Sequence, residues 1–493
     1  MPVQLADFPY LTIVLLSPLV AMIAIMFMPE EQKLNIKIIA TVAAAISLGI
    51  CLYLYYMYDK SVGGIQFAER MEWVPSLGIS YFVGVDGINA PLLLLNGIVF
   101  FTGCLTMWEL QLRVKEFFAW ICALVVGVFG VYMAFDLFFF FMFYEIGLLP
   151  MYLLIAIWGS TRKEYAAMKL TLYLLAGSTL IFPGLLALYT YSPIKTFDWL
   201  ILSQQPFTLE QQKLIFFLCY FGFGVLAAIW PFHTWSPVGH VAAPTAVSML
   251  HAGVLMKLGA FGILRIAMQL APEGLVYWAP TMAMLATIGI VYGALAGLAQ
   301  TDLKYIIGYS SVSHMGVVCL GLSTLTVDGI NGAVFQMFAH GIMTALFFSS
   351  VGYIYDRTHT REIFDLGGMS KVMPVASAYF ICAALCGLGC PGFASFWAEL
   401  LVFISTFQVY PIKGALAIGA LIVATLFALR VIMRTFYVEP NPKFTGPGFE
   451  DVTLFLGTPR IILVATLIIF GLFPRLMVDV IQVAVEPFVR TLV

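Results

Sequence analysis

Long apolar runs recur from one end of this chain to the other, each of 18 or more residues and so long enough to cross a hydrocarbon core about 30 Å thick. Only 10% of the 493 residues are charged, whereas a soluble domain carries about 25% charged residues. We therefore expect an all-α polytopic membrane protein. The net charge of −2 offers no electrostatic attraction for nucleic acid.

Hydropathy predicts about fourteen transmembrane helices. The expected spans are 9–28, 34–57, 88–108, 117–134, 136–158, 165–191, 212–234, 243–267, 278–299, 304–324, 330–354, 373–405, 411–437 and 457–487. The first run lacks the basic segment and the cleavage site of a signal peptide, so we expect a retained span. The hydrophilic stretch 59–87 mixes apolar and aromatic residues with Gly and Pro, which predicts an extended hairpin on one surface. The other loops are short, and we expect no second domain.

The positive charges of the loops indicate the orientation. If the spans are numbered from the N-terminus, the odd-numbered loops hold Lys33, Lys37, Arg113, Lys115, Arg162, Lys163, Lys304, Arg357, Arg361, Lys371 and Lys443. The even-numbered loops hold Lys60, Arg70, Lys195, Lys213 and Lys413. Positive loops stay on the cytoplasmic side. Both termini are therefore expected on the positive (periplasmic, outer) side of the cell (inner) membrane.

Two spans are interrupted in the sequence, near 226–243 and near 386–399. The first contains Pro231, Pro237 and Pro244, and the second contains four residues from Gly389 to Gly392 in an otherwise apolar run. Proline removes a backbone donor and clashes with the preceding turn. Broken helices in the two halves of a chain are typical of transporters built from inverted repeats. Two ordinary proline kinks remain the alternative.

Ionisable residues stand inside several apolar spans. Glu145 follows "FFFFMFY", although a charge at the bilayer centre costs about 2.5–3.5 kcal/mol. Such a residue is expected to face other helices or water and to have a function. The residues of this kind are Asp136, Glu145, Lys257, His314, His340 and Glu399. Histidine changes its protonation near neutral pH, and a line of such groups joined by water can transfer protons. A structural ion pair or a satisfied core residue is the alternative for each member.

Three cysteines, at positions 382, 386 and 390, lie four residues apart on one helical face. Metal-binding cysteines usually occur as CxxC pairs with further polar ligands, which are missing here. We interpret the three as small residues that pack one helix against another, and we expect no bound metal.

Four segments of the chain are distinctive: "FYEIGLLPMYLLIAIWG", "PFHTWSPVGHVAAPTAVSMLHAGVLMKLGAFGILR", "QTDLKYIIGYSSVSHMGVV" and "GAVFQMFAHGIMTALFFSSVGYIYDRTHTREI". They resemble signature segments of the antiporter-like membrane subunits of respiratory complex I. The similarity runs from about position 66 to 436 and is strongest to the M-type (chain 4) subunits. We expect no long lateral helix of the L-type, and Glu399 stands where the N-type subunit has a lysine.

This resemblance implies a single antiporter-like transmembrane domain over 1–493, with peripheral spans 1–3, core repeats at about 117–267 and 278–437, and a final span at 457–487. It implies a proton-translocating subunit in the membrane arm of an NADH (or ferredoxin):quinone oxidoreductase. FMN, iron–sulfur clusters and quinone would belong to partner subunits, and no cofactor or redox centre is expected on this chain. The expected partners are L- and N-type neighbours and the lipid bilayer.

The resemblance also implies roles for individual residues. Glu145 would receive the coupling signal at a subunit boundary, Lys257 would be the central lysine of the proton path, and Glu399 would be the acidic residue toward the exit. The other expected proton-translocating residues are His251, Lys304, His314 and His340. The expected accessory polar residues are Glu109, Asp136, His233, His240 and Asp302.

One departure from the family pattern concerns the seventh span. The family has a lysine five residues before the proline of the "PFHTW" block, and Leu226 stands there in this chain. The usual acidic residue after Pro237 is also missing. We expect His251 to take over part of the work of the missing lysine, and the alternative is that it hydrogen-bonds a free carbonyl of the broken span. A subunit of a multi-chain Na⁺/H⁺ antiporter or of a membrane-bound hydrogenase, and a non-pumping scaffold, remain the alternative functions.

Overall fold

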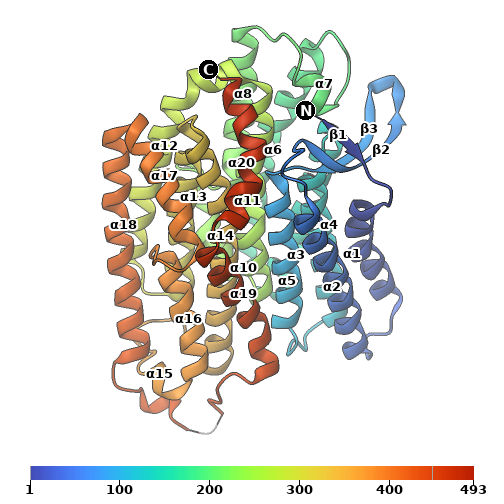
Figure 1. Ribbon diagram of the computed structural model, residues 1–493. Coiled ribbons are helices and arrows are strands. Elements are labelled where there is room, and N and C mark those ends of the chain that lie inside the picture. The colour runs from blue at the N-terminus through green and yellow to red at the C-terminus, as the bar shows by residue number, and fades with distance from the viewer. Residues whose placement is uncertain (1, 447, 493) are drawn as a thin grey trace.

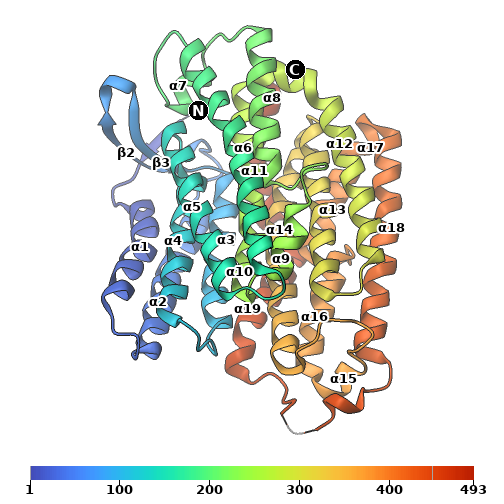
Figure 2. The same ribbon diagram turned by 180° about the vertical axis from the view of Figure 1, so that it is seen from behind.

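The computed structural model describes residues 2–446 and 448–492 and consists of a bundle of helices beside a small sheet (Figure 1). Twelve helices of this described part are long and apolar enough to cross a membrane. The seventh and twelfth expected spans are the two broken ones, so the prediction of about fourteen spans in an all-α membrane protein agrees with the structure. The two chain ends lie toward the same end of the bundle, which is also the end of the sheet (Figures 1 and 2).

Two helices and the sheet form the N-terminal part. The elements are β1 (Val3–Leu5), α1 (Tyr10–Phe27), α2 (Lys33–Met57), β2 (Ile65–Val74), the 3-10 helix η1 (Pro75–Leu77) and β3 (Ile79–Val85). Strand β2 pairs with β1 in parallel and with β3 in antiparallel orientation. The hairpin predicted for 59–87 is therefore confirmed. Glu69 of β2 accepts hydrogen bonds from the N–H groups of Leu11 (2.7 Å) and Thr12 (3.1 Å), which ties the hairpin to the start of α1.

The first half of the bundle continues with five helices. They are α3 (Asn89–Thr106), α4 (Val114–Met133), α5 (Leu137–Trp158), α6 (Lys163–Tyr191) and the short α7 (Trp199–Leu202). The three spans expected to be peripheral are α1, α2 and α3. Helices α1 and α2 keep broad exposed faces. Helix α3 is buried over nearly its whole length and packs against α2 and α4.

The predicted break near 226–243 is confirmed. The chain forms α8 (Leu209–Leu226), α9 (Trp235–Ala242), α10 (Thr245–Leu250), the π-helical segment η2 (His251–Leu255), α11 (Met256–Gly262) and a second π-helical segment, η3 (Ile263–Met268). At the break, the carbonyl of Val225 accepts hydrogen bonds from the N–H of Ala228 (3.1 Å) and from the indole of Trp235 (2.9 Å). Protein therefore satisfies the interrupted backbone, as membrane depth requires.

The second half begins with long helices and ends with shorter ones. The elements are α12 (Pro272–Ala299), α13 (Leu303–Ser323), α14 (Val327–Thr358), α15 (Met369–Val372), α16 (Pro374–Gly387), α17 (Ala394–Val409), α18 (Pro411–Ile432), π-helical η4 (Met433–Tyr437), 3-10 helical η5 (Pro442–Phe444), α19 (Leu454–Leu472) and α20 (Arg475–Arg490). The predicted break near 386–399 is confirmed between α16 and α17. There Gly389 and Gly392 adopt φ angles of +64° and +99°, which favour glycine.

The last expected span is not one helix. The prediction of a single span over 457–487 is wrong, because α19 ends at Leu472 and α20 begins at Arg475. Pro474 lies between them and cannot donate a backbone hydrogen bond to the preceding turn. Helix α20 then packs its buried face against α14.

The two halves share one capping arrangement. Asp136 caps α5 and Asp302 caps α13, each by accepting hydrogen bonds from the N–H groups two and three residues later. In the first half the adjoining backbone pairs with the segment around Asp198, and in the second half with the segment around Glu362. Since successive spans alternate in direction, the two arrangements lie at opposite ends of the bundle, as two inverted repeats require.

Candidate functional site

Lys257 lies at the centre of a row of buried ionisable side chains. It is fully buried on α11, and its Nζ donates a hydrogen bond to the carbonyl of Ala252 in the π-helical segment η2. The same Nζ lies 2.7 Å from Nδ1 of His340, a fully buried residue of α14. A carbonyl and an accepting imidazole are both uncharged, so Lys257 can exchange its proton without breaking an ion pair.

The row continues from His340 to Glu399. The ring centroids of His340 and His314 lie 5.1 Å apart, and Nδ1 of His314 lies 3.1 Å from Oε1 of Glu399. The amide of Gln336 lies 3.1 Å from the same carboxylate oxygen and 3.2 Å from His314 Nδ1. Helices α13, α14 and α17 thus each supply a polar side chain to one buried cluster.

The break before α17 makes room for Glu399. A Cβ atom on Gly389 would lie 2.9 Å from Oε2 of Glu399, closer than carbon and oxygen normally approach. A side chain at this position would therefore displace the carboxylate. The glycine supports the site through its small size as well as through its φ angle.

On the other side of Lys257 the row continues through two histidines. The rings of His251 and His240 lie 4.2 Å apart, and His251 stacks on Trp235 at 5.1 Å. His240 also lies 3.1 Å from the hydroxyl of Ser236 through Nε2. In the described part of the chain, neither ring nitrogen of His251 has a hydrogen-bond partner. The alternative in which His251 bonds a free carbonyl of the broken span is therefore not what the structure contains.

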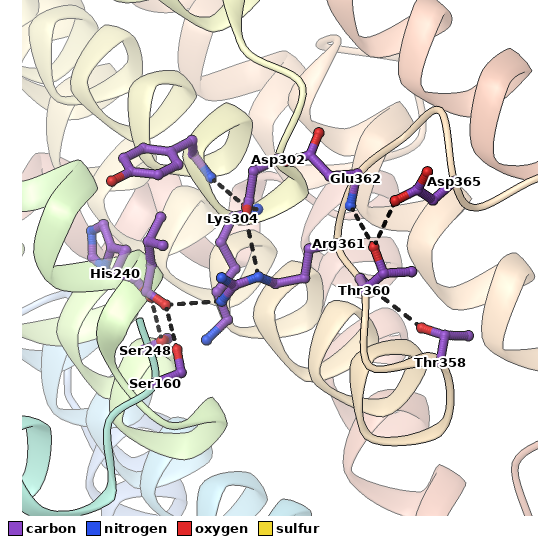
Figure 3. Close-up of polar contacts among 12 residues, drawn as sticks. Ser160, His240, Ser248, Asp302, Lys304, Thr358, Thr360, Arg361, Glu362 and Asp365 are labelled. Carbon is purple, nitrogen blue, oxygen red and sulfur yellow. Dashed lines mark hydrogen bonds and ion pairs between the residues drawn. The ribbon is translucent and has the colours of Figure 1, made fainter. Parts of the chain in front are cut away.

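Lys304 approaches the row from α13 (Figure 3). It is buried, and its Nζ donates a hydrogen bond of 2.7 Å to the carbonyl of Ala243, the residue that closes α9. The hydroxyl of Ser248 donates to the same carbonyl (3.2 Å) and to that of His240 (3.0 Å). Lys304 thus bonds the end of the helix that carries His240.

Glu145 lies outside this row. It is half-buried on α5, and among the described residues its buried Oε1 has no hydrogen-bond partner. Helix α8 presents apolar groups in this region, since Leu226 is fully buried and Phe223 packs against Tyr144 with ring centroids 6.1 Å apart. On α5 itself, Leu149 is exposed one turn beyond Glu145.

The remaining expected accessory residues serve other contacts. His233 is buried beside the ring of Tyr292 (4.8 Å), away from the row. Glu109 forms an ion pair of 3.2 Å with Arg357, and Asp136 and Asp302 are the helix caps described above. The structure therefore brings together His240, His251, Lys257, Lys304, His314, His340 and Glu399, and leaves Glu109, Asp136, Glu145 and His233 apart.

Sequence reasoning missed two polar features. Gln336 precedes His340 by four residues on α14, a spacing that places both on one helical face and so could have indicated it. The second is the ion pair between Asp86 and Arg265, whose atoms lie 2.7 Å apart and whose side chains are each 1% exposed. No local pattern indicates this pair, because its partners are far apart in the sequence.

The cysteines at positions 382, 386 and 390 lie along α16 and the break that follows it. The thiol of Cys386 lies 3.1 Å from the hydroxyl of Ser395, so it contacts the neighbouring α17. Within residues 2–446 and 448–492, no group of three or more His, Cys, Asp or Glu side chains is arranged to hold a metal ion.

Comparisons with known proteins agree with this architecture. Residues 134–425 match the family described as NADH:quinone oxidoreductase/Mrp antiporter, transmembrane region. A chain 4 of NAD(P)H-quinone oxidoreductase from Synechococcus sp. is 36% identical, over 98% of this chain and 94% of the relative. A chain in the structure of respiratory complex I from Thermus thermophilus with bound NADH superposes with a TM-score of 0.91 at 26% identity, over 98% of this chain and 100% of the other. A chain of the Mrp complex from Dietzia sp. has the same fold, with a TM-score of 0.83 at 20% identity over 98% of both chains.

Proposed function

Because the chain belongs to the transmembrane family shared by NADH:quinone oxidoreductases and Mrp antiporters, we propose that it is the proton-translocating membrane-arm subunit of a complex I-type NADH (or ferredoxin):quinone oxidoreductase. One observation carries this proposal, which is the buried row that joins Lys257 through His340 and His314 to Glu399. In this account electron transfer takes place in partner subunits that hold FMN, iron–sulfur clusters and quinone.

The row can pass protons because its members hold a proton at one atom and release it from another. Lys257 holds a proton on Nζ, and His340 accepts through Nδ1. An imidazole that accepts on one nitrogen can release a proton from the other. His314 then lies against the carboxylate of Glu399, which is the terminal acceptor on α17. The ring centroids of His340 and His314 lie 5.1 Å apart, so the two rings are direct neighbours in the row.

Glu145 has a different role in this proposal. Its position on α5, with an exposed leucine one turn away and no partner on α8, fits a carboxylate that faces a neighbouring subunit. Glu145 would then respond to the charge of that neighbour and pass the coupling signal to Lys257. His251 lies on η2 directly before α11, which carries Lys257, and its ring contacts that of His240 on α9. We therefore propose that it takes over part of the work of the missing seventh-span lysine.

The proposal places L- and N-type subunits beside the chain in the cell (inner) membrane, with both termini on the positive, outer side. The excess of Lys and Arg in the loops at the opposite end supports this orientation. The Mrp likeness supports the fold alone, and a non-pumping scaffold is favoured only by Leu226.

The chains that co-purify with this protein test the assignment. The proposal predicts quinone-binding and iron–sulfur subunits in the purified complex, together with proton uptake into vesicles when the electron donor is added. A purified assembly that contains only antiporter-like chains would assign the protein to an Mrp-type antiporter. An oxidoreductase complex whose proton uptake is unaffected by Lys257→Met would favour the scaffold.

A further inference from the structure

A polar cavity of about 680 Å³ opens at the end of the bundle away from the sheet. Its walls come from the loop between α5 and α6, from α9, from the start of α13 and from the segment that follows α14. Asp302, Arg361 and Val241 belong to the lining. Several residues of its rim are exposed, including Arg162 and His359. This is also the end at which the loops carry most of the Lys and Arg residues.

An ion pair between Arg361 and Asp302, drawn in Figure 3, forms part of the wall of this cavity. Nε of Arg361 lies 3.1 Å from Oδ2 of Asp302, with the two side chains only 8% and 16% exposed. Arg361 also donates through Nη1 to the carbonyl of Val241 (3.0 Å) near the end of α9. Backbone hydrogen bonds from Leu303 to Arg361 and from Ile363 to Thr301 hold the two segments in register. One guanidinium therefore ties α13 to α9.

Lys304 lies behind this pair and is only 4% exposed. It bonds the carbonyl of Ala243, two residues after the carbonyl that Arg361 bonds. The last carbonyls of a helix carry partial negative charge and favour cations. The end of α9 therefore holds one cation on the cavity side and a second cation, Lys304, on the interior side.

Asp356 of α14 is a further charged group near Lys304, and His240 is the ionisable group of α9 that feels the charge of Lys304. One turn along α13, a Cβ atom on Gly308 would lie 3.0 Å from Cα of Pro237 and 3.8 Å from Cδ2 of His240. Helices α13 and α9 are therefore in direct contact at this level, with the ring of His240 between them. From His240 the row continues through His251 to Lys257.

We propose that protons enter the row from this cavity by way of Lys304, and that Arg361 is a positioning residue whose ion pair with Asp302 separates the cavity from Lys304. Arginine stays protonated at all relevant pH values, so Arg361 does not carry the proton itself. When the pair opens, water from the cavity reaches Lys304 Nζ, and when it closes the proton on Lys304 can move only inward. The inward direction of proton movement in this inference rests on the proposed function.

The rate at which a thiol reagent reaches position 304 tests whether the ion pair closes the cavity, and this measurement does not depend on pumping. Lys304→Cys would be made in the intact complex, with Cys382→Ser and Cys390→Ser to remove the two partly exposed thiols. A water-soluble methanethiosulfonate reagent would then be added on the side of the membrane to which the cavity opens. Loss of the charge-assisted hydrogen bonds in Arg361→Gln should speed labelling about tenfold. Asp302→Asn should do the same while its amide oxygen still caps α13.

Arg357→Gln is the matched control, because it breaks an ion pair at the same end of α14 with Glu109, which does not line the cavity. Labelling at position 304 should not change in this variant. Equal labelling rates with Arg361 and with Arg361→Gln or Asp302→Asn would overturn the inference.

The complex with native Lys304 gives the second measurement. An open pair should lower the number of protons moved per electron about twofold or more while quinone reduction continues, because a proton on Lys304 can return to the cavity. A merely structural defect would lower both rates in proportion, and that result would also overturn the inference. A wild-type complex that reduces quinone without moving protons would instead overturn the proposed function, while the labelling result would still decide whether the pair closes the cavity.

Discussion

Lys257 and His340 are joined by one buried contact, in which Nζ lies 2.7 Å from Nδ1. The ammonium group has only donors, so Nδ1 must be the acceptor and the ring proton of a neutral His340 sits on Nε2. The geometry therefore fixes which nitrogen faces the lysine and which is free to face the next member of the row.

Replacement of His340 tests this arrangement. His340→Phe keeps a ring of similar size in the fully buried site but has no nitrogen to accept or release a proton. We expect proton uptake to fall about tenfold or more, because acid–base groups of this kind contribute factors of about 10²–10⁴. Assembly, measured by gel mobility of the complex, should be retained. Uptake at the wild-type rate in His340→Phe would place the path elsewhere.

Glu145→Gln tests the role of the carboxylate on α5 that lies outside the row. The amide keeps the shape of the side chain and removes its charge, so the complex should assemble normally. Coupling between sites typically changes affinities about 5–150-fold, so we expect at least a fivefold loss of proton pumping. The measurement is the proton-to-electron ratio of the purified complex in vesicles. Full pumping in a well-assembled variant would remove Glu145 from the mechanism.

His251→Leu tests the replacement of the missing lysine. Pumping should decrease while assembly is preserved, because His251 makes no hydrogen bond whose loss would disturb the described structure. Leu226→Lys in the same background should then restore part of the pumping, because it returns a lysine to the seventh span. Normal pumping in His251→Leu would show that protons reach Lys257 by another way.

The Asp86–Arg265 pair should matter for stability. Asp86→Asn leaves the charge of Arg265 buried without its partner, and removal of one member of a buried pair typically costs about 3–5 kcal/mol. We expect a lower melting temperature and a smaller yield of assembled complex. Lys60→Gln is the control, because its pair with Asp479 spans 4.0 Å and is about half exposed, so its loss should cost about 1 kcal/mol or less. Equal stability of the two variants would contradict this assignment.

Much of the fold follows from local sequence signals. Hydropathy places the spans, and the prolines after Leu226 and the glycines around Cys390 mark the two breaks. The π-helical segments at His251 and Arg265 could not be predicted, because one extra residue in a turn leaves no trace in the composition of an apolar run. The break at Pro474 was missed because the apolar run continues on both sides of it.

The sequence predicts which kinds of residue form the site, but it does not predict how they are arranged. His233 and His240 lie in the same sequence block, yet only His240 joins the row, because the turn before α9 directs the two rings to different sides. The partners of Lys304 and Arg361 are backbone carbonyls at the end of α9. Such partners have no side-chain signature, so only the folded chain identifies them.

The rate of proton uptake by the intact complex with Lys257→Met tests the central claim most directly. Methionine fills nearly the same volume without a proton to exchange, so the rate should fall about tenfold or more, whereas Lys257→Arg should keep more of it. Equal losses in the two variants would mean that the size and shape of Lys257 matter and not its proton. A wild-type rate of proton uptake in fully assembled Lys257→Met would contradict the account.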